Sequence, residues 1–109
     1  MRTVELGDPW GALADPTRRA VLARVAECPR SVEQIAATLP VSRPAVSQHL
    51  SVLKAARLVI DRAEGTRRFY AVDPRGIEAV RDWLDGFWDK SLAAFKAAAE
   101  REATKERKP

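Results

Sequence analysis

The sequence predicts a small, mainly helical domain that carries one two-stranded β-hairpin, and three observations support this fold class. Apolar residues recur at helical spacing over most of the chain and change to a β-branched pattern only between residues 58 and 72. Asp-Pro pairs at residues 8–9, 15–16 and 73–74 have the form of a helix N-cap followed by proline at the first helical position. Two short helical patterns meet with almost no linker around residues 39–41. The expected order is four short helices, the hairpin and a long fifth helix.

The composition limits what kind of protein this is. The 109 residues, 46% of them hydrophobic, suffice for one domain with a small core. The net charge of +4 is a modest basic excess, so only its placement is informative about partners. One cysteine and one histidine exclude a disulfide framework and a zinc finger and favour a reducing compartment, so we expect a cytoplasmic protein. No apolar run approaches ~20 residues, and we expect no membrane partner.

The first part of the chain is expected to form an arm and three short helices. Residues 1–7 show no clear period and are assigned to an N-terminal arm. The Asp-Pro pairs at residues 8–9 and 15–16 open the first two helices, and the second ends near Glu27 because a Cys-Pro pair follows it. Residues 31–34 read Ser-Val-Glu-Gln, a capping box that begins a third helix of about two turns.

The fourth helix, expected over residues 42–57, has an unusually uncharged polar face. Val46, Leu50 and Leu53 form a narrow apolar stripe on one side. The other side carries hydroxyl and carboxamide groups, which both donate and accept hydrogen bonds and therefore suit base edges and phosphates. With the third helix and the tight turn it forms a helix-turn-helix. The candidates for DNA contact on this helix are Ser42, Arg43, Pro44, Ser47, Gln48, Ser51 and Lys54.

The hairpin directly after a helix-turn-helix is interpreted as a wing. Residues 58–62 and 67–72 form its strands, and Gly65 offers the positive φ that the turn needs. The arginines beside the turn are candidates for contact with phosphates or the minor groove: Arg62, Arg67 and Arg68. Alternatively, one of the three is paired with Asp61 or Glu64.

The final helix is expected to begin at the third Asp-Pro pair and to reach about Ala99, which gives a domain over residues 8–99. Residues 100–109 are almost all charged and are assigned to a flexible tail. The aromatic stripe of this helix is too wide for one small core, so we favour a homodimer interface over a purely internal role. The candidate interface residues are Trp10, Leu13, Trp83, Leu84, Phe87, Trp88 and Phe95.

Three segments together resemble the ArsR/SmtB family of bacterial winged-helix repressors. They are LADPTRR at residues 13–19, VSRPAVSQHLSVL at residues 41–53 and GTRRFY at residues 65–70. The similarity runs from about residue 10 to residue 88. It implies a homodimer, paired through its first and last helices, that binds an inverted-repeat operator in double-stranded DNA, often upstream of its own gene. It also implies that residues 42–57 are the recognition helix and residues 61–69 the wing.

The chain departs from the metal-sensing pattern of that family. Many members sense metals or arsenicals through a Cys-x-Cys segment before the recognition helix, where this chain has approximately Ser31 and Glu33. Others use Asp and His pairs on the last helix, which here holds Asp82, Asp85 and Asp89 but no histidine. We therefore predict no metal site and no cofactor, and the sequence names no small-molecule inducer. A metal-responsive repressor with an atypical site and a winged-helix protein-interaction module that does not bind DNA are the alternatives.

Two further groups of residues have open roles. Thr17, Arg18 and Arg19 lie at a helix start, which attracts anions, so they either contact phosphate or are solvated or ion-paired. His49 lies at the margin of the apolar stripe and is expected to be a buried, hydrogen-bonded structural residue. The single histidine and cysteine lie far apart and no glycine-rich phosphate loop is present, so we predict that the protein is not an enzyme.

Overall fold

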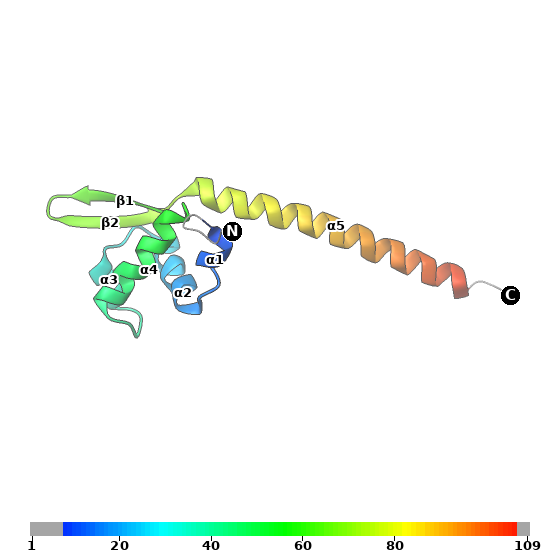
Figure 1. The fold of residues 1–109 in the computed structure, drawn as a ribbon, viewed down its shortest axis with the longest axis horizontal. Helices are drawn as coiled ribbons and strands as arrows, with labels where there is room; N and C mark the ends of the chain where they lie inside the picture. Colours follow the sequence, from blue (N-terminus) through cyan, green and yellow to red (C-terminus); the bar gives the residue numbers. More distant parts are fainter. Residues whose placement is uncertain (1–7, 107–109) are drawn as a thin grey trace. The chain divides into compact units, whose positions relative to one another are not determined.

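The computed structural model describes residues 8–106, and the elements in this range follow the predicted order (Figure 1). They are α1 (Pro9–Ala12), α2 (Pro16–Glu27), α3 (Val32–Ala36), α4 (Arg43–Ala55), β1 (Val59–Glu64), β2 (Arg67–Val72) and α5 (Pro74–Glu106). The helices and the antiparallel hairpin confirm the predicted fold class. The chain divides into two compact units, Met1–Glu78 and Ala79–Pro109, which are described separately below. The predicted arm at residues 1–7 lies outside the described residues.

The short helices begin at the capping residues that the sequence predicts. The Asp8 and Asp15 carboxylates accept hydrogen bonds from backbone N–H groups two residues further on, at 3.0 and 2.8 Å. Ser31 and Gln34 form the complete reciprocal capping box of α3. The Ser42 hydroxyl accepts a hydrogen bond from a backbone N–H in the first turn of α4 at 3.2 Å. Local side-chain chemistry therefore fixes where each of these helices starts.

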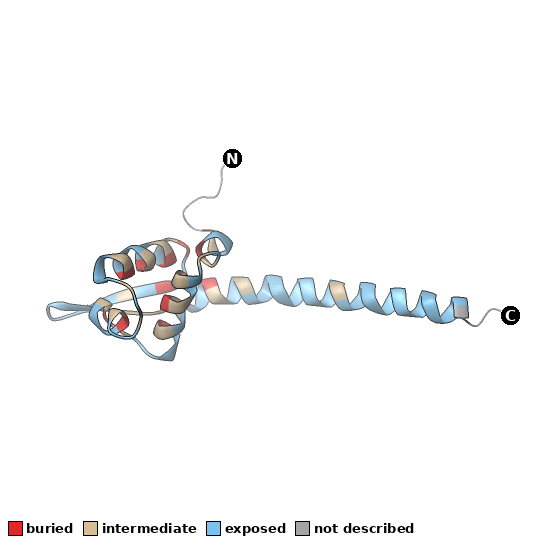
Figure 2. Cartoon of the chain, turned by 90° about the horizontal axis from the view of Figure 1, so that it is seen from below, coloured by how far each residue is buried: buried red, intermediate tan, exposed pale blue. Residues whose placement is uncertain are grey.

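The core of the first unit lies where α2, α3 and α4 meet the base of the hairpin. Figure 2 shows buried residues along the inner faces of α2 and α4. The fully buried side chains are Val21, Val25, Ile35, Val46, Leu50, Leu53, Leu58 and Val59. Three of them, at positions 46, 50 and 53, are the apolar stripe predicted for α4. Because this stripe faces the core, the polar side of α4 faces outward.

The end of α4 differs from the prediction. The helix ends at Ala55, and Arg57 has φ +63°, in the left-handed region. The N–H of Arg57 donates to the Lys54 carbonyl at 3.0 Å, and the N–H of Leu58 donates to the Leu53 carbonyl at 2.9 Å, which together form a Schellman motif. The predicted continuation through Arg57 is wrong because this reversal directs Leu58 into the core.

The first turn of α5 approaches the end of α4 closely. A Cβ atom at Gly76 would lie 1.9 Å from the Arg57 carbonyl oxygen, so the approach requires glycine. Asp73, which precedes α5, is buried, and its N–H donates to the Leu58 carbonyl at 2.9 Å. Its carboxylate accepts hydrogen bonds from the Arg75 guanidinium at 3.0 and 3.2 Å. The start of α5 thus belongs structurally to the first unit.

The hairpin is longer than predicted, and a third segment of the chain pairs with it. Its register runs from Val59 opposite Val72 to Glu64 opposite Arg67, and Gly65 adopts φ +64° at the turn as predicted. β1 therefore extends two residues beyond the predicted end at residue 62. Arg30 adds an isolated bridge on the other edge of β2, with backbone hydrogen bonds to and from Tyr70 of 3.0 and 2.8 Å. The segment between α2 and α3 is thereby joined to the wing.

The second unit consists of the helical residues of α5 from Ala79 onward. The helix continues to Glu106 instead of ending near Ala99, so residues 100–106 are helical. Almost all side chains in this part of α5 are exposed (Figure 2). In the described range, no helix has the length and apolarity needed to cross a bilayer. The division of the chain into arm, domain and tail stays a prediction.

Candidate nucleic-acid interface

The outward face of α4 carries the neutral polar side chains that the sequence singles out. Ser47, Gln48 and Ser51 are exposed, as are Ser42 and Pro44 in or next to the first turn. Within residues 8–106, the hydroxyls of the serines at positions 47 and 51 and the Gln48 carboxamide have no hydrogen-bond partner. The Ser42 hydroxyl, in contrast, serves as the helix cap. The middle of this face thus presents free donors and acceptors to another molecule.

Most of the predicted cationic contacts are paired with carboxylates of the same chain. The four pairs are Arg43 with Glu33 (2.9 Å), Lys54 with Asp61 (2.8 Å), Arg62 with Glu64 (3.0 Å) and Arg68 with Asp61 (2.6 Å). Two wing arginines are therefore paired, whereas the sequence offered the pairing of one as an alternative to DNA contact. Half-exposed pairs of this kind contribute little to stability, so a phosphate group is able to replace the carboxylate.

Asp61 is the exception among these carboxylates, because its side chain is only 9% exposed. The hydrogen bond from the Lys54 ammonium, together with that from the Arg68 guanidinium, holds the pKa of Asp61 below its ordinary value. Burial acts in the opposite direction but is outweighed. Asp61 is therefore ionised at neutral pH.

Arg67 differs from the other wing cations. Its guanidinium donates a hydrogen bond to the buried Ser31 hydroxyl at 3.2 Å and lies 5.1 Å from the centroid of the Phe69 ring. Among the residues that the structure describes, no carboxylate pairs with it. Hydrogen bonding and cation–π contact direct the side chain across the wing toward the N-terminus of α3 and leave its charge unneutralised.

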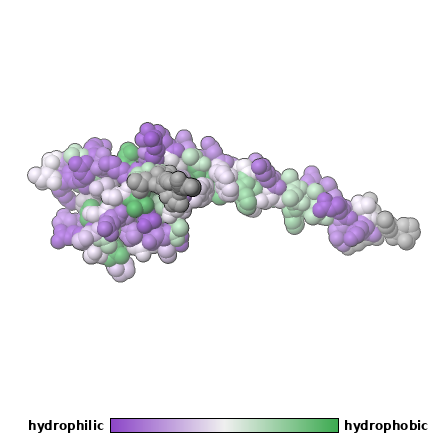
Figure 3. Space-filling view, viewed as in Figure 1, coloured by the Kyte–Doolittle hydropathy of each residue, from purple (hydrophilic) through white to green (hydrophobic). Residues whose placement is uncertain are grey.

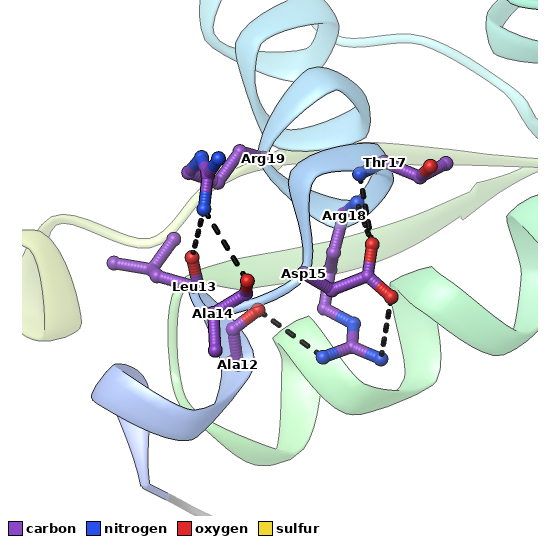
Figure 4. A network of polar contacts seen from close by, with 7 residues as sticks. All are labelled: Ala12, Leu13, Ala14, Asp15, Thr17, Arg18 and Arg19. Atoms are coloured by element: carbon purple, nitrogen blue, oxygen red, sulfur yellow. Dashed lines mark hydrogen bonds and ion pairs between the residues drawn. The ribbon is translucent and has the colours of Figure 1, made fainter.

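Arg18 and Arg19 hold the junction between α1 and α2 together (Figure 4). Arg18 donates to the Ala12 carbonyl at 3.2 Å and lies 3.9 Å from the Asp15 carboxylate. Arg19 donates to the Leu13 carbonyl at 2.8 Å. Both arginines thus satisfy carbonyls at the end of α1, a role that the sequence did not indicate. The backbone hydrogen bond from Arg18 is the main reason why the pKa of Asp15 is lowered.

His49 does not behave entirely as expected. Its side chain is partly buried, but Nδ1 is buried without a hydrogen-bond partner in the described part of the chain. The sequence predicts a buried, hydrogen-bonded histidine, whereas the residue is only partly buried and no hydrogen bond is found at Nδ1 within the described residues.

The apolar face of α5 is exposed in the second unit. The predicted interface residues at positions 83, 84, 87, 88 and 95 are between 47 and 73% exposed, and Leu92 joins them at 47%. The rings of Trp83 and Phe87 stack with centroids 5.2 Å apart. In Figure 3 hydrophobic atoms gather along the middle of α5 and hydrophilic atoms toward its C-terminal end. In the first unit, Trp10 is 44% exposed, whereas Leu13 is partly buried.

The positions where metal ligands would be sought have other partners. Ser31 caps α3, and Glu33 pairs with Arg43. Over residues 8–106, no three His, Cys, Asp or Glu side chains are grouped so that they could hold a metal ion. The absence of a metal site stays a prediction.

Comparisons with known proteins match the part of the chain that contains α4. The model of the family described as "Bacterial regulatory protein, arsR family" matches residues 15–61, from α2 into β1. The transcriptional regulator Rv2034 of Mycobacterium tuberculosis is 58% identical over 86 residues, 79% of this chain and 80% of the relative. The transcriptional repressor SdpR of Bacillus subtilis is 29% identical over 85 residues, 78% of this chain and 94% of SdpR. The chain is also similar to a solved structure from Mycobacterium bovis, the homodimeric winged helix-turn-helix DNA-binding domain of a possible ArsR-family regulator. The TM-score is 0.61 at 30% sequence identity, and the match covers 76% of this chain and 77% of that domain.

Proposed function

Because this chain belongs to the ArsR family of bacterial transcriptional regulators, which are not enzymes, we propose that it is a homodimeric repressor in the cytoplasm that binds an inverted-repeat operator in double-stranded DNA. One observation carries the proposal: the exposed Ser47, Gln48 and Ser51 on α4 have donors and acceptors without partners in the described chain. A carboxamide in this position forms paired hydrogen bonds to an adenine edge, and hydroxyls bond to either base edges or phosphates.

In this proposal α4 enters the major groove and the wing lies along the backbone. Arg43, Ser47 and Gln48 read bases, Pro44 packs against a sugar or a thymine methyl, and the remaining groups contact the groove, phosphates or the minor groove. The remaining groups are Ser42, Ser51, Lys54, Arg62, Arg67 and Arg68. Two recognition helices of a dimer would meet successive major grooves about 34 to 36 Å apart. Arg62, which is paired with the exposed carboxylate of Glu64, exchanges this partner for a phosphate.

The proposed dimer uses the exposed apolar face of α5 together with Trp10 and Leu13. Isolated exposed apolar residues are common, but a continuous row of aromatic and aliphatic side chains indicates an interface. The homodimeric state of the similar domain from Mycobacterium bovis supports this assignment. The proposal includes no metal site, and it leaves the effector that would release DNA unassigned.

The function is tested by selecting duplexes from a random library with the wild-type protein. Affinity for a selected duplex and for a scrambled duplex of the same composition is then measured over a salt series. We expect a preference for the selected duplex and a linear fall of log affinity with log salt. Gln48→Ala should weaken binding to the selected duplex by about 1 to 3 kcal/mol and change scrambled binding little. A flat salt dependence or no preference would instead favour a protein-interaction module.

A further inference from the structure

We propose that Asp61 is a positioning residue that fixes the wing against the recognition helix α4 and thereby sets the preference for one DNA sequence over another. The inference rests on the DNA binding proposed above. It concerns a carboxylate, which would itself be repelled by DNA phosphates. Its role must therefore be indirect, through the groups that it holds.

The Asp61 side chain connects three elements. It lies on β1, and its Oδ1 is 2.8 Å from Nζ of Lys54 in the last turn of α4. Its Oδ2 is 2.6 Å from a terminal guanidinium nitrogen of Arg68 on β2. We call this arrangement the Asp61 clamp. Each carboxylate oxygen serves a different element, so the reading helix and both strands of the wing meet at one side chain.

The hairpin register explains how the clamp forms. Asp61 lies opposite Tyr70, which makes Arg68 its diagonal neighbour on the same face of the hairpin. Lys54 reaches the same carboxylate from α4, and the two cationic side chains are 56 and 54% exposed. The clamp therefore consists of one carboxylate that is only 9% exposed and two cationic side chains that are about half exposed to solvent.

The nearby pair of Arg62 and Glu64 provides a contrast. Both residues lie on β1, their side chains are 70 and 52% exposed, and the pair joins no other element. Glu64 and Asp61 thus contribute the same charge from the same strand in two different settings. Only Asp61 is placed to control the position of the wing relative to α4.

The different surroundings of Asp61 and Glu64 predict different effects on DNA binding when the negative charge of either residue is removed. Loss of a carboxylate beside DNA strengthens binding to every duplex, because one repulsive charge is gone. Loss of the clamp leaves Lys54 and Arg68 facing one another without an anion between them, which separates the wing from α4. Base contacts then lose their register, so the preference for the selected duplex falls even though general attraction to DNA rises.

The test compares Asp61→Asn with the matched control Glu64→Gln, each of which removes one negative charge from β1. Affinities are measured for the selected and the scrambled duplex at one salt concentration. For Glu64→Gln we expect both affinities to rise together and their ratio to stay within about twofold of wild type. For Asp61→Asn we expect the ratio to fall about tenfold, as for a mismatched base pair. Asp61→Glu, which keeps the charge, should retain most of the preference.

The outcomes separate the inference from the function on which it rests. A wild-type protein without preference overturns the proposed function, whereas a wild-type preference that persists in Asp61→Asn overturns the role of Asp61. Hydrogen exchange of the unbound proteins provides a second measurement, with Arg68→Gln in place of Asp61→Asn if the latter does not fold. Breaking either arm of the clamp should speed exchange of the amides in residues 59–72, and unchanged exchange would contradict the inference.

Discussion

At Arg57 the backbone adopts a conformation that is usually left to glycine. The left-handed region costs a residue with a Cβ about 1 to 2 kcal/mol. Three neighbouring features hold Arg57 there: the Schellman hydrogen bonds, the burial of Leu58 and the close approach of Gly76 to the Arg57 carbonyl. The conformation at this residue is thus imposed by its surroundings.

Because its surroundings impose the positive φ on Arg57, we predict that Arg57→Gly stabilises the protein although it deletes a whole side chain. We expect the free energy of unfolding in urea to rise by about 1 kcal/mol, because glycine adopts positive φ without the steric cost. Ala55→Gly is the control, since position 55 is helical. There the same replacement should lower the free energy by about 1 kcal/mol. Losses of similar size in both variants would show that Arg57 is not strained.

At the scale of elements, α5 is unusual because its apolar residues form an exposed face. Helices in proteins gain most of their stability from packing of such a face. The stacked pair of Trp83 and Phe87 lies near the start of the row, and Phe95 lies further along it at 73% exposed. Pairing with a second copy of this chain would remove this surface from water.

We therefore predict that Phe87→Glu dissociates the dimer, because a carboxylate would be buried without a partner. Light scattering of the wild type should give about twice the chain mass of 12.1 kDa, and the variant should give the mass of one chain. Ala93→Glu places the same group on the opposite side of the helix and should leave the mass of the wild type unchanged. A dimeric Phe87→Glu variant, or a monomeric wild type, would count against the interface.

The elements also show how far the sequence could be used for prediction. Helix starts depend on one side chain and its own backbone, so Asp8, Asp15 and Ser31 indicated them correctly. The end of α4 was misplaced because the residue with positive φ is not a glycine. The bridge between Arg30 and Tyr70 joins segments 40 residues apart, and no local pattern signals it.

The candidate nucleic-acid interface could likewise be predicted from the sequence only in part. The neutral polar face of α4 follows from helical spacing alone, and the structure exposes it as predicted. The pairing of Arg68 with Asp61 depends on the hairpin register, which the sequence pattern left open. The sequence therefore offered Asp61 and Glu64 as equivalent partners, whereas the side chains of these two residues are 9 and 52% exposed. Contacts with DNA themselves remain predictions.

At the scale of the whole molecule, carboxylates that accept hydrogen bonds or ion pairs from the same chain occur at the junctions between elements. Asp15 lies between α1 and α2, Asp61 joins α4 to the hairpin, and Asp73 lies between the hairpin and α5. The pKa of each is lowered from the ordinary value of 3.8. For Asp73 the cause is mainly hydrogen bonding from Arg75.

These lowered pKa values predict how stability depends on pH. The unfolded chain binds protons at these carboxylates more readily than the folded chain, so their contribution is present above the ordinary pKa of 3.8 and is lost as the pH falls below it. Urea unfolding between pH 7 and pH 3 should show a decline mainly below about pH 4. Asp73→Asn should be less stable at pH 7 and show a shallower decline in acid. An equally steep decline in this variant would exclude Asp73 as a contributor.

The bridge at Arg30 also bears on the behaviour of this protein at high concentration. A free strand edge is a template onto which a strand of another molecule can add. One edge of β2 is paired with β1, and the other is occupied at Tyr70 by Arg30. The outer edge of β1 carries Asp61, Arg62 and Glu64, charges of the kind that discourage such pairing. The hairpin is thus protected on both sides against edge-to-edge aggregation.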